Sequence, residues 1–256
     1  QLVLAHGLTL ANILCVEFIK MVKNRSDWEQ YFQSLTLEGR AFIDGQYCWA
    51  ASGETFASNS PVDGRFLANV ASTDVADADI AVQAARRAFE SGVWSGLAPV
   101  ERKRILIRFA DLILAHKEEL ALLETLDMGK PISDALAIDV PATANAIRWN
   151  AEAIDKIYDE VAPTPADQLG LITREPAGVV AAIVPWNFPL IMASWKFAPA
   201  LAAGNSFILK PSEKSPLSAI RIAQLALEAG IPKGVFNVLP GFGHTVGKAL
   251  ALHADV

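Results

Sequence analysis

The amino-acid sequence predicts an α/β protein built around a doubly wound parallel sheet. Three short, almost wholly apolar runs are typical of strands buried on both faces: GVVAAIV at 178–184, NSFILK at 205–210 and GVFNVLP at 234–240. Between them, apolar residues recur at helical spacing near 190–203 and 216–229. Strands that alternate with helices favour a parallel sheet whose connections cross over through helices.

Composition limits the class of protein. With 256 residues the chain can bury a large core, as one large domain or as parts of two. It is 52% hydrophobic and 20% charged, which is typical of a soluble globular protein. The formal net charge of −6 argues against nucleic acid or an acidic membrane as a partner. The basic cluster ERKR at 101–104 precedes helically spaced apolar residues, so we expect a solvated helix face there.

Cysteine usage predicts a cytoplasmic protein without disulfides. Cys15 and Cys48 are the two cysteines of the chain, and their spacing suits neither a disulfide framework nor a metal site. The four histidines show no metal-ligand or catalytic-triad spacing either. We therefore expect no metal centre.

Residues 1–26 are expected to form an N-terminal extension or a disordered segment. The first 20 residues are apolar, but they lack a basic start, and polar residues such as Glu17 interrupt them, which argues against a signal peptide or a membrane span. The first methionine is Met21. We hypothesise that translation starts there.

Residues 27–157 are expected to form a hairpin and a helical layer. A short helix is expected early in this region, and Asp44-Gly45 between two apolar runs predicts a tight β-hairpin. Helical spacing of apolar residues then covers 74–91, 98–127 and 131–157. The breaks between these segments are marked by Gly92, Gly129 and Pro131.

Residues 158–177 are expected to form a projecting arm. Pro163 and Pro165 precede QLGLITRE, an extended run that suits an exposed hairpin. Such an arm favours contact between subunits, and a plain surface loop is an equal alternative. From 178 onward the sheet core follows, in which Ser215 is expected as N-cap of the second helix, Pro216 as its first residue and Gly230 as its stop.

The ends of the three apolar runs are where a ligand site is expected, because ligands bind outside the carboxyl ends of parallel strands. Asn187, in PWNF, can donate a hydrogen bond to developing negative charge, or its side chain can simply shape a turn. Glu213, in KPSE with Lys210, can accept the hydroxyls of a ribose, or the two can form a surface ion pair.

The third run ends in a glycine-rich segment. Gly241, Gly243 and Gly247 would let a backbone approach a cofactor, but their spacing is not that of the usual G-x-G-x-x-G motif. A single-sheet dehydrogenase of the ordinary dinucleotide-binding type is disfavoured, because no glycine fingerprint follows the first strand. Each signal is weak alone, and together at three successive strand ends they indicate a ligand site.

These motifs also carry a family resemblance. VPWNFPLIMASWKFAPALAAGNSFILKPSEKSPLSA, with LETLDMGKP upstream and GFGHTVG downstream, resembles the NAD(P)-dependent aldehyde dehydrogenase superfamily from about Trp28 to Val256. The stretches ALLETLDMGKPI, RWNAEAIDKIYDEVAPT and LKPSEKSPLSAIR are most similar to bacterial γ-glutamyl-γ-aminobutyraldehyde dehydrogenases of putrescine breakdown. The resemblance implies an aldehyde dehydrogenase-like fold: an incomplete Rossmann-type sheet, an N-terminal helical layer and an oligomerisation hairpin.

The resemblance assigns roles to the strand-end residues. Asn187 would donate to the oxyanion that forms when a cysteine thiolate attacks the aldehyde, after which hydride passes to the nicotinamide and a glutamate-activated water hydrolyses the thioester. Lys210 and Glu213 would hold the adenosine ribose, and the carboxylate of Glu213 would repel a 2′-phosphate, which favours NAD⁺ over NADP⁺. The remaining cofactor contacts would be Ile183, Val184, Pro185, Trp186, Gly243 and Gly247.

The substrate residues are also implied by the resemblance. Phe188, Met192 and Trp195 match positions that line the aldehyde tunnel, with ordinary core packing as the alternative. Asp139 falls at the tunnel mouth, where a carboxylate could attract an amine, or it could simply lie at a helix N-terminus. The expected substrate is a γ-glutamylated or free aminoaldehyde, with betaine aldehyde or a simple aliphatic aldehyde as alternatives.

The sequence also departs from the family. A complete member continues past the point matched by Val256, into the glycine-rich helix start, the general-base glutamate and the nucleophilic cysteine. We therefore expect this chain to be the N-terminal portion of an aldehyde dehydrogenase, inactive alone, from a full-length homodimer or homotetramer. The alternatives are a non-catalytic nucleotide-binding protein and an oligomerisation partner of longer subunits.

Overall fold

The computed structural model describes residues 23–256, so the expectations for residues 1–20 and for Met21 lie outside the described residues. The chain divides into two compact units, one ending at Thr36 and the other running from Leu37 to Val256. In the first unit, α2 (Arg25–Ser34) is the short helix that was predicted. A reciprocal capping box starts it: the Asn24 side chain accepts from the Asp27 N–H, and the Asp27 carboxylate accepts from the Asn24 N–H.

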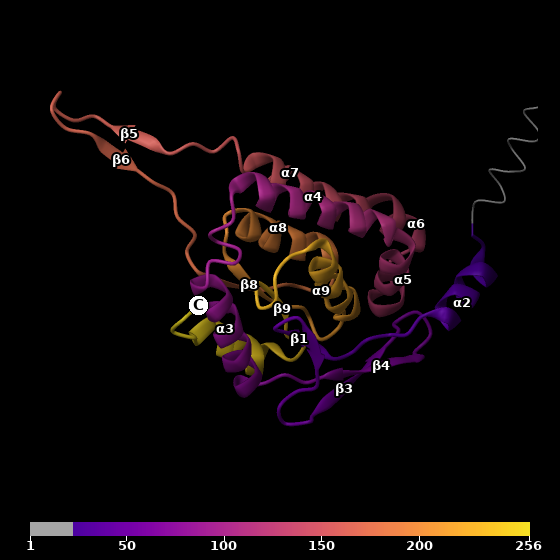
Figure 1. Cartoon of the computed structure of the whole chain (residues 1–256). Helices are drawn as coiled ribbons and strands as arrows, with labels where there is room; N and C mark the ends of the chain where they lie inside the picture. The colour runs from indigo at the N-terminus through magenta and orange to yellow at the C-terminus, as the bar shows by residue number, and fades with distance from the viewer. Residues whose placement is uncertain (1–22) are drawn as a thin grey trace, which may run out of the picture. The chain divides into compact units, whose positions relative to one another are not determined.

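The second unit is built on a five-stranded sheet with the order β2-β1-β9-β8-β7 (Figure 1). The three apolar runs form its parallel strands, β7 (Val179–Ile183), β8 (Ser206–Lys210) and β9 (Phe236–Val238). The five residues of β8 are all buried, as expected for a strand that lies between two neighbours and is covered on both faces. The predicted parallel core is confirmed.

The Asp44-Gly45 hairpin is also confirmed, and it extends the sheet. Its strands are β1 (Ala41–Ile43) and β2 (Gln46–Cys48), and both turn residues have positive φ, 51° and 77°. β1 pairs antiparallel with β9, which makes the sheet mixed. The side chain of Asn237 secures this junction, since it accepts from the Asp44 N–H at 3.0 Å and donates to the Gly234 carbonyl at 2.7 Å.

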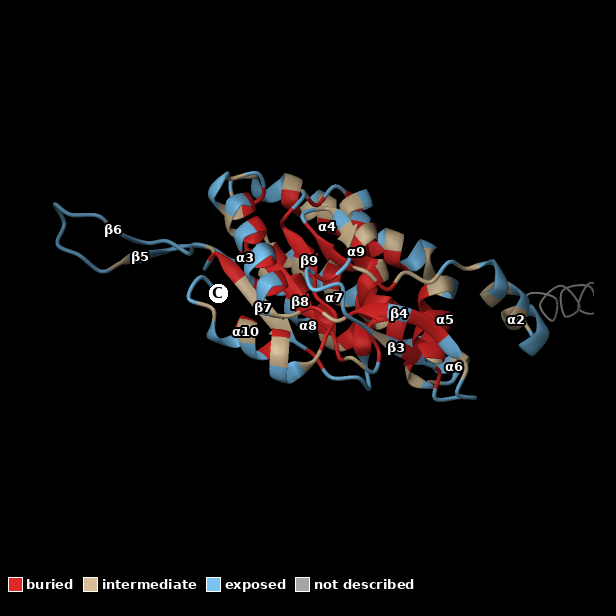
Figure 2. Ribbon diagram, turned by 90° about the horizontal axis from the view of Figure 1, so that it is seen from below, coloured by how far each residue is buried: buried red, intermediate tan, exposed pale blue. Residues whose placement is uncertain are grey.

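Helices cover both faces of the sheet, and buried residues concentrate between them (Figure 2). The crossover helices are α8 (Pro189–Ala202) and α9 (Leu217–Ala229). Side chains alternate between the faces of β8. Phe207 packs in an aromatic cluster with Phe197 of α8 and Phe236, whose ring stacks on that of Phe207 at 5.9 Å. Ile208 packs in a second cluster with the small side chains of α3 (Val75–Glu90).

The helical layer differs from the prediction in its breaks. The segment expected at 98–127 is two helices, α4 (Pro99–Ala115) and α5 (Lys117–Met128), because His116 leaves helical geometry between them. Gly129 ends α5 in the left-handed conformation. The next segment comprises α6 (Ile132–Asp134), a short π-helical turn η1 (Ala135–Asp139) and α7 (Val140–Ala153).

Arg102 corrects the expectation for the ERKR cluster. Its side chain is buried, and its guanidinium donates to the carbonyls of Ala202 at 3.0 Å and Leu97 at 3.2 Å. Ala202 is the last residue of α8, whose final carbonyls have no partner within the helix. Only part of the cluster is therefore a solvated face, because Arg102 ties α4 to the end of α8.

The arm and a second hairpin complete the unit. β5 (Glu160–Ala162) and β6 (Gly170–Ile172) pair antiparallel in an arm that projects from the body, as predicted (Figure 1). The hairpin of β3 (Thr55–Asn59) and β4 (Phe66–Ala71) was not predicted. At the C-terminal end lie a π-helical turn η2 (Gly243–Gly247) and α10 (Lys248–Leu252). Within residues 23–256, no helix is long and apolar enough to cross a membrane.

Candidate functional site

The carboxyl ends of β7 and β8 meet, and hydrogen bonds join the segments that follow them. The Val184 N–H donates to the Lys210 carbonyl at 3.1 Å. The hydroxyl of Ser215 donates to the Trp186 carbonyl at 3.2 Å. Ser215 therefore does not cap α9 as predicted, since α9 begins at Leu217 with Pro216 in the N-cap position; Gly230 ends it as predicted. The PWNF and KPSE motifs lie side by side.

Lys210 and Glu213 form an ion pair whose cation is buried. The Lys210 side chain lies with its Nζ 3.6 Å from Glu213 Oε2, and the residue is 2% exposed, whereas Glu213 is partly exposed. Burial lowers the pKa of Lys210, while attraction to Glu213 acts in the opposite direction. A surface ion pair, the alternative considered for these residues, would not bury its lysine. The pair leaves a carboxylate at the solvent boundary with a cation directly behind it.

Two of the predicted cofactor residues, Ile183 and Gly247, lie next to this lysine. A Cβ atom added to Gly247 of η2 would lie 3.5 Å from Ile183 Cδ1 and 4.0 Å from Lys210 Cδ. Gly247 thus packs against the ends of β7 and β8, and Ile183 is exposed beside it. Gly243, at the other end of η2, lies in open space with no atom within 4 Å of an added Cβ.

The PWNF residues differ in what they expose. Asn187, Pro185, Trp186 and Phe188 are exposed. The Asn187 side chain makes no hydrogen bond with any residue in the range 23–256, so it does not shape the turn through a side-chain bond, and its amide is free to donate. Val184 differs from these residues, because its side chain is buried.

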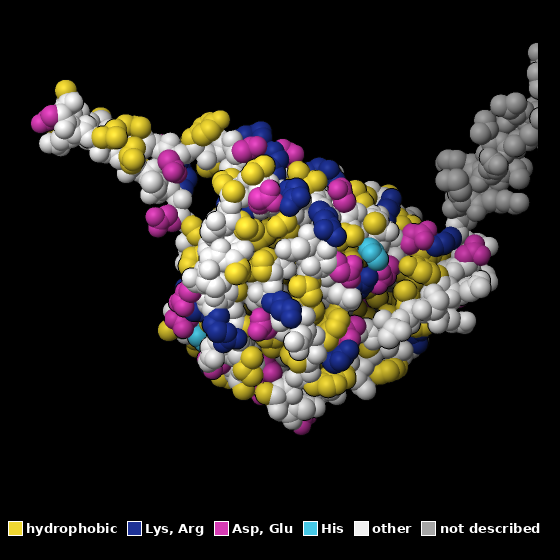
Figure 3. Space-filling view, viewed as in Figure 1, with side chains coloured by type: hydrophobic (Ala, Val, Ile, Leu, Met, Phe, Trp, Pro, Cys, Tyr) yellow, Lys and Arg dark blue, Asp and Glu magenta, His cyan; other side chains and the backbone are white. Residues whose placement is uncertain are grey.

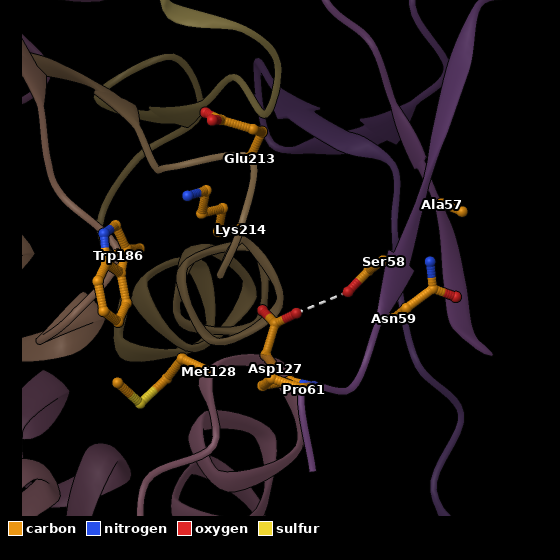
Figure 4. A pocket seen from close by; sticks show the side chains of 9 residues that line it. All are labelled: Ala57, Ser58, Asn59, Pro61, Asp127, Met128, Trp186, Glu213 and Lys214. Carbon is orange, nitrogen blue, oxygen red and sulfur yellow. Dashed lines mark hydrogen bonds between the residues drawn. The ribbon is translucent and has the colours of Figure 1, made fainter. Parts of the chain in front are cut away.

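A pocket of about 420 Å³ lies beside these segments (Figure 4). Trp186, Glu213 and Lys214 lie across it from Ser58 and Asn59 of β3. Asp127 and Met128 of α5 also line it. Sequence reasoning missed the contribution of β3, because the β3–β4 hairpin was not predicted, although Asp127 lies inside the quoted LETLDMGKP motif.

Two carboxylates of α5 are buried, and one of them, Asp127, lines the pocket. Asp127 is 3% exposed, and accepts from the Ser58 hydroxyl at 2.7 Å and from the Leu217 N–H at 2.8 Å. Glu124 is fully buried; one of its oxygens accepts from the Leu190 N–H at 2.9 Å, and the other has no partner in the described part of the chain. Burial raises the pKa of each group to about 7.

From the raised pKa values of these two groups we expect the free energy of unfolding to fall as the pH rises. Their folded-state pKa of about 7 lies above the ordinary 4.5 of Glu124 and 3.8 of Asp127, so between these values the folded chain holds protons that the unfolded chain has released. The stabilising contribution is complete below the ordinary pKa and is lost as the pH rises through about 7. We expect a loss of about 3 to 4 kcal/mol for each group, as an order of magnitude.

Denaturant unfolding at a series of pH values checks this expectation. Replacing both groups, as Glu124→Gln with Asp127→Asn, should flatten the fall in the free energy of unfolding between about pH 5 and about pH 8. The exposed Glu175→Gln is the matched control and should leave the slope unchanged. Equal slopes in the wild type and the double variant would show that burial of these carboxylates does not control the pH dependence.

Asp139 is placed differently from the tunnel-mouth prediction. It is 1% exposed, and its carboxylate is paired with the ammonium group of Lys130. The Nζ of Lys130 also lies 3.8 Å from the centroid of the Phe188 ring, a cation–π contact. Asp139 is therefore not available to attract a substrate amine, because Lys130 already neutralises it. Its place between η1 and α7 is continuous helix, so it is no exposed helix N-terminus either.

The predicted tunnel residues lie along one side of α8. Phe188 and Trp195 are exposed, 41% and 58%, and Met192 between them is half-buried. Met192 and Trp195 are three positions apart on one face of α8, and Phe188 is the residue directly before the helix. The three side chains form an apolar stripe that begins next to Asn187. Core packing, the alternative for these residues, does not hold for Phe188 and Trp195. Among residues 23–256, no cluster of three or more His, Cys, Asp or Glu side chains is arranged to hold a metal ion.

The comparisons agree with the fold. Residues 38–256 match the aldehyde dehydrogenase family, and the chain belongs to this family, as its motifs indicated. It is 58% identical to the NADP/NAD-dependent aldehyde dehydrogenase PuuC of Escherichia coli over 229 residues, which are 90% of this chain and 46% of PuuC.

Two solved structures are similar in sequence and in fold. The indole-3-acetaldehyde dehydrogenase AldA of P. syringae, solved as a C302A mutant with NAD⁺ and IAA, is 71% identical with a TM-score of 0.91, over 92% of this chain and 48% of AldA. The γ-glutamyl-γ-aminobutyraldehyde dehydrogenase of Burkholderia cenocepacia J2315 is 62% identical with a TM-score of 0.89, over 90% and 47%. The predicted fold class is confirmed. The chain spans about half the length of these relatives.

Proposed function

We propose that this sequence supplies the adenosine-binding site and the oxyanion donor of an NAD⁺-dependent aldehyde dehydrogenase. The observation that carries the proposal is the buried Lys210, held 3.6 Å from the partly exposed Glu213, with Ile183 and the side-chain-free Gly247 packed against it. A carboxylate backed by an ammonium group suits the paired hydroxyls of a ribose, since it accepts from them while the cation donates.

The cofactor proposed is NAD⁺, with NADP⁺ binding more weakly. Glu213 brings a negative charge to the position proposed for the ribose, where a 2′-phosphate would be repelled. Two comparisons bear on this choice: AldA was solved with NAD⁺, and PuuC is named NADP/NAD-dependent. When bound, the nicotinamide of the cofactor accepts a hydride from the substrate.

Asn187 is proposed to stabilise the charge that develops on the aldehyde oxygen. Its amide is exposed, has no partner in residues 23–256, and lies in the segment between β7 and α8. A neutral Nδ2–H can donate to an oxygen that becomes negatively charged without giving up a proton. The apolar stripe of Phe188, Met192 and Trp195 would then shield that oxygen from water, which strengthens the hydrogen bond.

The substrate proposed first is an aminoaldehyde, free or γ-glutamylated. This proposal is supported by the likeness to the B. cenocepacia dehydrogenase. Asp139 does not support it, because its carboxylate is already paired with Lys130. An arylacetaldehyde is the second candidate. The exposed aromatic faces of Phe188 and Trp195 favour it, and so does likeness to AldA.

A chimera tests the activity. Residues 38–256 would replace the matching segment of PuuC, and NADH formation would be followed with γ-glutamyl-γ-aminobutyraldehyde, aminobutyraldehyde and indole-3-acetaldehyde. We expect turnover with NAD⁺ faster than with NADP⁺, and the substrate with the highest kcat/KM decides between the two candidates. A folded chimera that binds NAD⁺ but oxidises none of these aldehydes would contradict the proposed activity.

We also propose that the β5–β6 arm joins subunits of a homo-oligomer, dimer or tetramer. Its apolar side chains are exposed, among them Val161 and Leu171, and Figure 3 shows hydrophobic atoms along its length. In sedimentation experiments on the 256-residue chain, Val161→Glu with Leu171→Glu should shift the oligomer toward monomer. The control Val100→Glu, on the exposed start of α4, should not. A monomeric wild type would contradict the proposal.

The cytoplasmic location inferred from cysteine usage is part of this proposal. Cys48 is a free thiol in the structure, half-buried at the edge of the sheet, and burial raises its pKa. Cell fractionation followed by detection of the protein tests the location, and recovery outside the cytoplasmic fraction would contradict it.

A further inference from the structure

Two buried carboxylates on α5 hold the starts of both crossover helices. Glu124 accepts from the N–H of Leu190, the second residue of α8, and Asp127 accepts from the N–H of Leu217, the first residue of α9. Neither helix has a side-chain cap of its own, because Phe188 and Pro216 occupy the N-cap positions. The first N–H groups of a helix have no partner within it, and a carboxylate there also meets the positive end of the helix dipole.

The two helix starts directly follow the segments of the proposed site. Asn187 lies between β7 and α8, only three residues before Leu190. Lys210 and Glu213 lie at the end of β8 and in the turn that leads to Leu217. Glu124 and Asp127 are one helical turn apart on the same side of α5, so this one helix contacts both segments.

We propose that Glu124 is a positioning residue for Asn187, and that Asp127 is a positioning residue for the Lys210–Glu213 pair, each acting through the helix start that it holds. The functional part of this inference rests on the proposed function. The positioning part stands on the hydrogen bonds alone.

The two helix starts, which we call the PWNF corner and the KPSE corner, each have a second contact close to the carboxylate that holds them. These contacts argue for local positioning as well as general stability. The Ser58 hydroxyl donates to Oδ1 of Asp127, the oxygen that Leu217 does not use (Figure 4). Lys130, just beyond the end of α5, lies over the ring of Phe188, next to Asn187. A buried carboxylate with an unpartnered oxygen, as in Glu124, is costly compared with an apolar side chain of similar size. The cost is understandable if the group holds the PWNF corner.

Hydrogen exchange on the 256-residue chain tests the positioning. Glu124→Met should raise exchange in residues 186–192 and leave 211–217 unchanged, whereas Asp127→Leu should do the reverse. Glu124→Gln and Asp127→Asn keep an acceptor oxygen, so each should restore protection of its own segment. Exchange that rises equally in both segments for both variants would overturn the proposal, because it would indicate general destabilisation.

The functional readouts separate in the same way. NAD⁺ affinity should fall about tenfold in Asp127→Leu and stay unchanged in Glu124→Met. In the PuuC chimera, Glu124→Met should lower kcat about 10- to 100-fold at unchanged KM for NAD⁺, with recovery in Glu124→Gln. Normal kcat in Glu124→Met, or normal NAD⁺ affinity in Asp127→Leu, would overturn the corresponding functional half.

NAD⁺ binding and hydrogen exchange together show whether the proposed function or the positioning role is wrong. If the wild type does not bind NAD⁺ but the exchange pattern appears, the proposed function is wrong and the positioning of the two corners is supported. If the wild type binds NAD⁺ but the exchange pattern is absent, the positioning is wrong. Should a Met or Leu variant not fold, Ser58→Ala removes one of the two bonds to Asp127 and should raise exchange in 211–217 only; unchanged exchange there would count against the proposal.

Discussion

Replacing Asn187 with alanine in the PuuC chimera should lower kcat about 100- to 1000-fold, because a donor to an oxyanion is typically worth about 3 to 4 kcal/mol. The side chain is exposed and makes no hydrogen bond with another residue in 23–256, so its removal should leave folding intact. KM for NAD⁺ should stay the same, since Lys210 and Glu213 are unchanged. Steady-state kinetics with saturating aldehyde measure both quantities.

Two variants make the Asn187 result specific. Asn187→Asp preserves the size of the side chain but replaces the donor by an anion, and it should be at least as impaired as the alanine variant. Gln83→Ala removes an amide from an exposed position of α3 and should retain full kcat. If Asn187→Ala kept more than about a tenth of the wild-type kcat, the oxyanion role would be wrong.

Lys210→Met in the 256-residue chain should weaken NAD⁺ binding about 10- to 100-fold, the range expected for losing a hydrogen bond from a charged donor. The thermal midpoint of unfolding should not fall, and we expect it to rise. Burial lowers the pKa of Lys210, which means that the folded state disfavours this charge, and methionine is a similarly long side chain without it. Calorimetric titration and thermal unfolding give the two values.

The opposite signs of these two effects distinguish a binding role from a structural one. If Lys210 and Glu213 were only a structural pair, removing the lysine would lower stability and leave NAD⁺ binding unaffected. Lys156→Met, in the exposed turn that follows α7, is the control and should change neither value. Unchanged affinity in Lys210→Met would contradict the assignment of the ribose site.

The sheet was predictable because its strands are buried on both faces. An almost continuous apolar run, as in Val179–Ile183 and Ser206–Lys210, has few alternatives to a covered parallel strand. The Asp44-Gly45 turn was equally clear, because both of its residues need positive φ. The strand ends then followed from topology, which is why the segments with Asn187 and with Lys210 and Glu213 could be expected together, whereas Ile183 was expected there from the family resemblance.

The β3–β4 hairpin was not predictable from its residues. TFASN contains small and polar side chains, and four of its five positions are at least partly exposed, so it lacks the apolar alternation that marks a strand. Its pairing with β4 depends on contacts distant along the chain. The pocket wall formed by Ser58 and Asn59 was missed for the same reason.

Buried charge was the other source of error. Glu124, Asp127, Asp139 and Arg102 all lie inside the unit, although charged residues are mostly exposed. Each has a backbone group or side chain as its partner. For Glu124, Asp127 and Arg102 that partner is distant along the chain, so sequence spacing gives no sign of it. Asp139 shows the consequence: its residue type suggested attraction of an amine, and the structure gives it Lys130 as a partner.

A calorimetric titration of the 256-residue chain with NAD⁺ and, separately, with NADP⁺ shows whether Lys210 and Glu213 form a nucleotide site. We expect saturable binding of NAD⁺ with one site per chain, weaker binding of NADP⁺, and NAD⁺ binding that is about 10- to 100-fold weaker in Lys210→Met. A folded chain that binds neither nucleotide, or that binds NAD⁺ equally well without Lys210, would contradict this assignment.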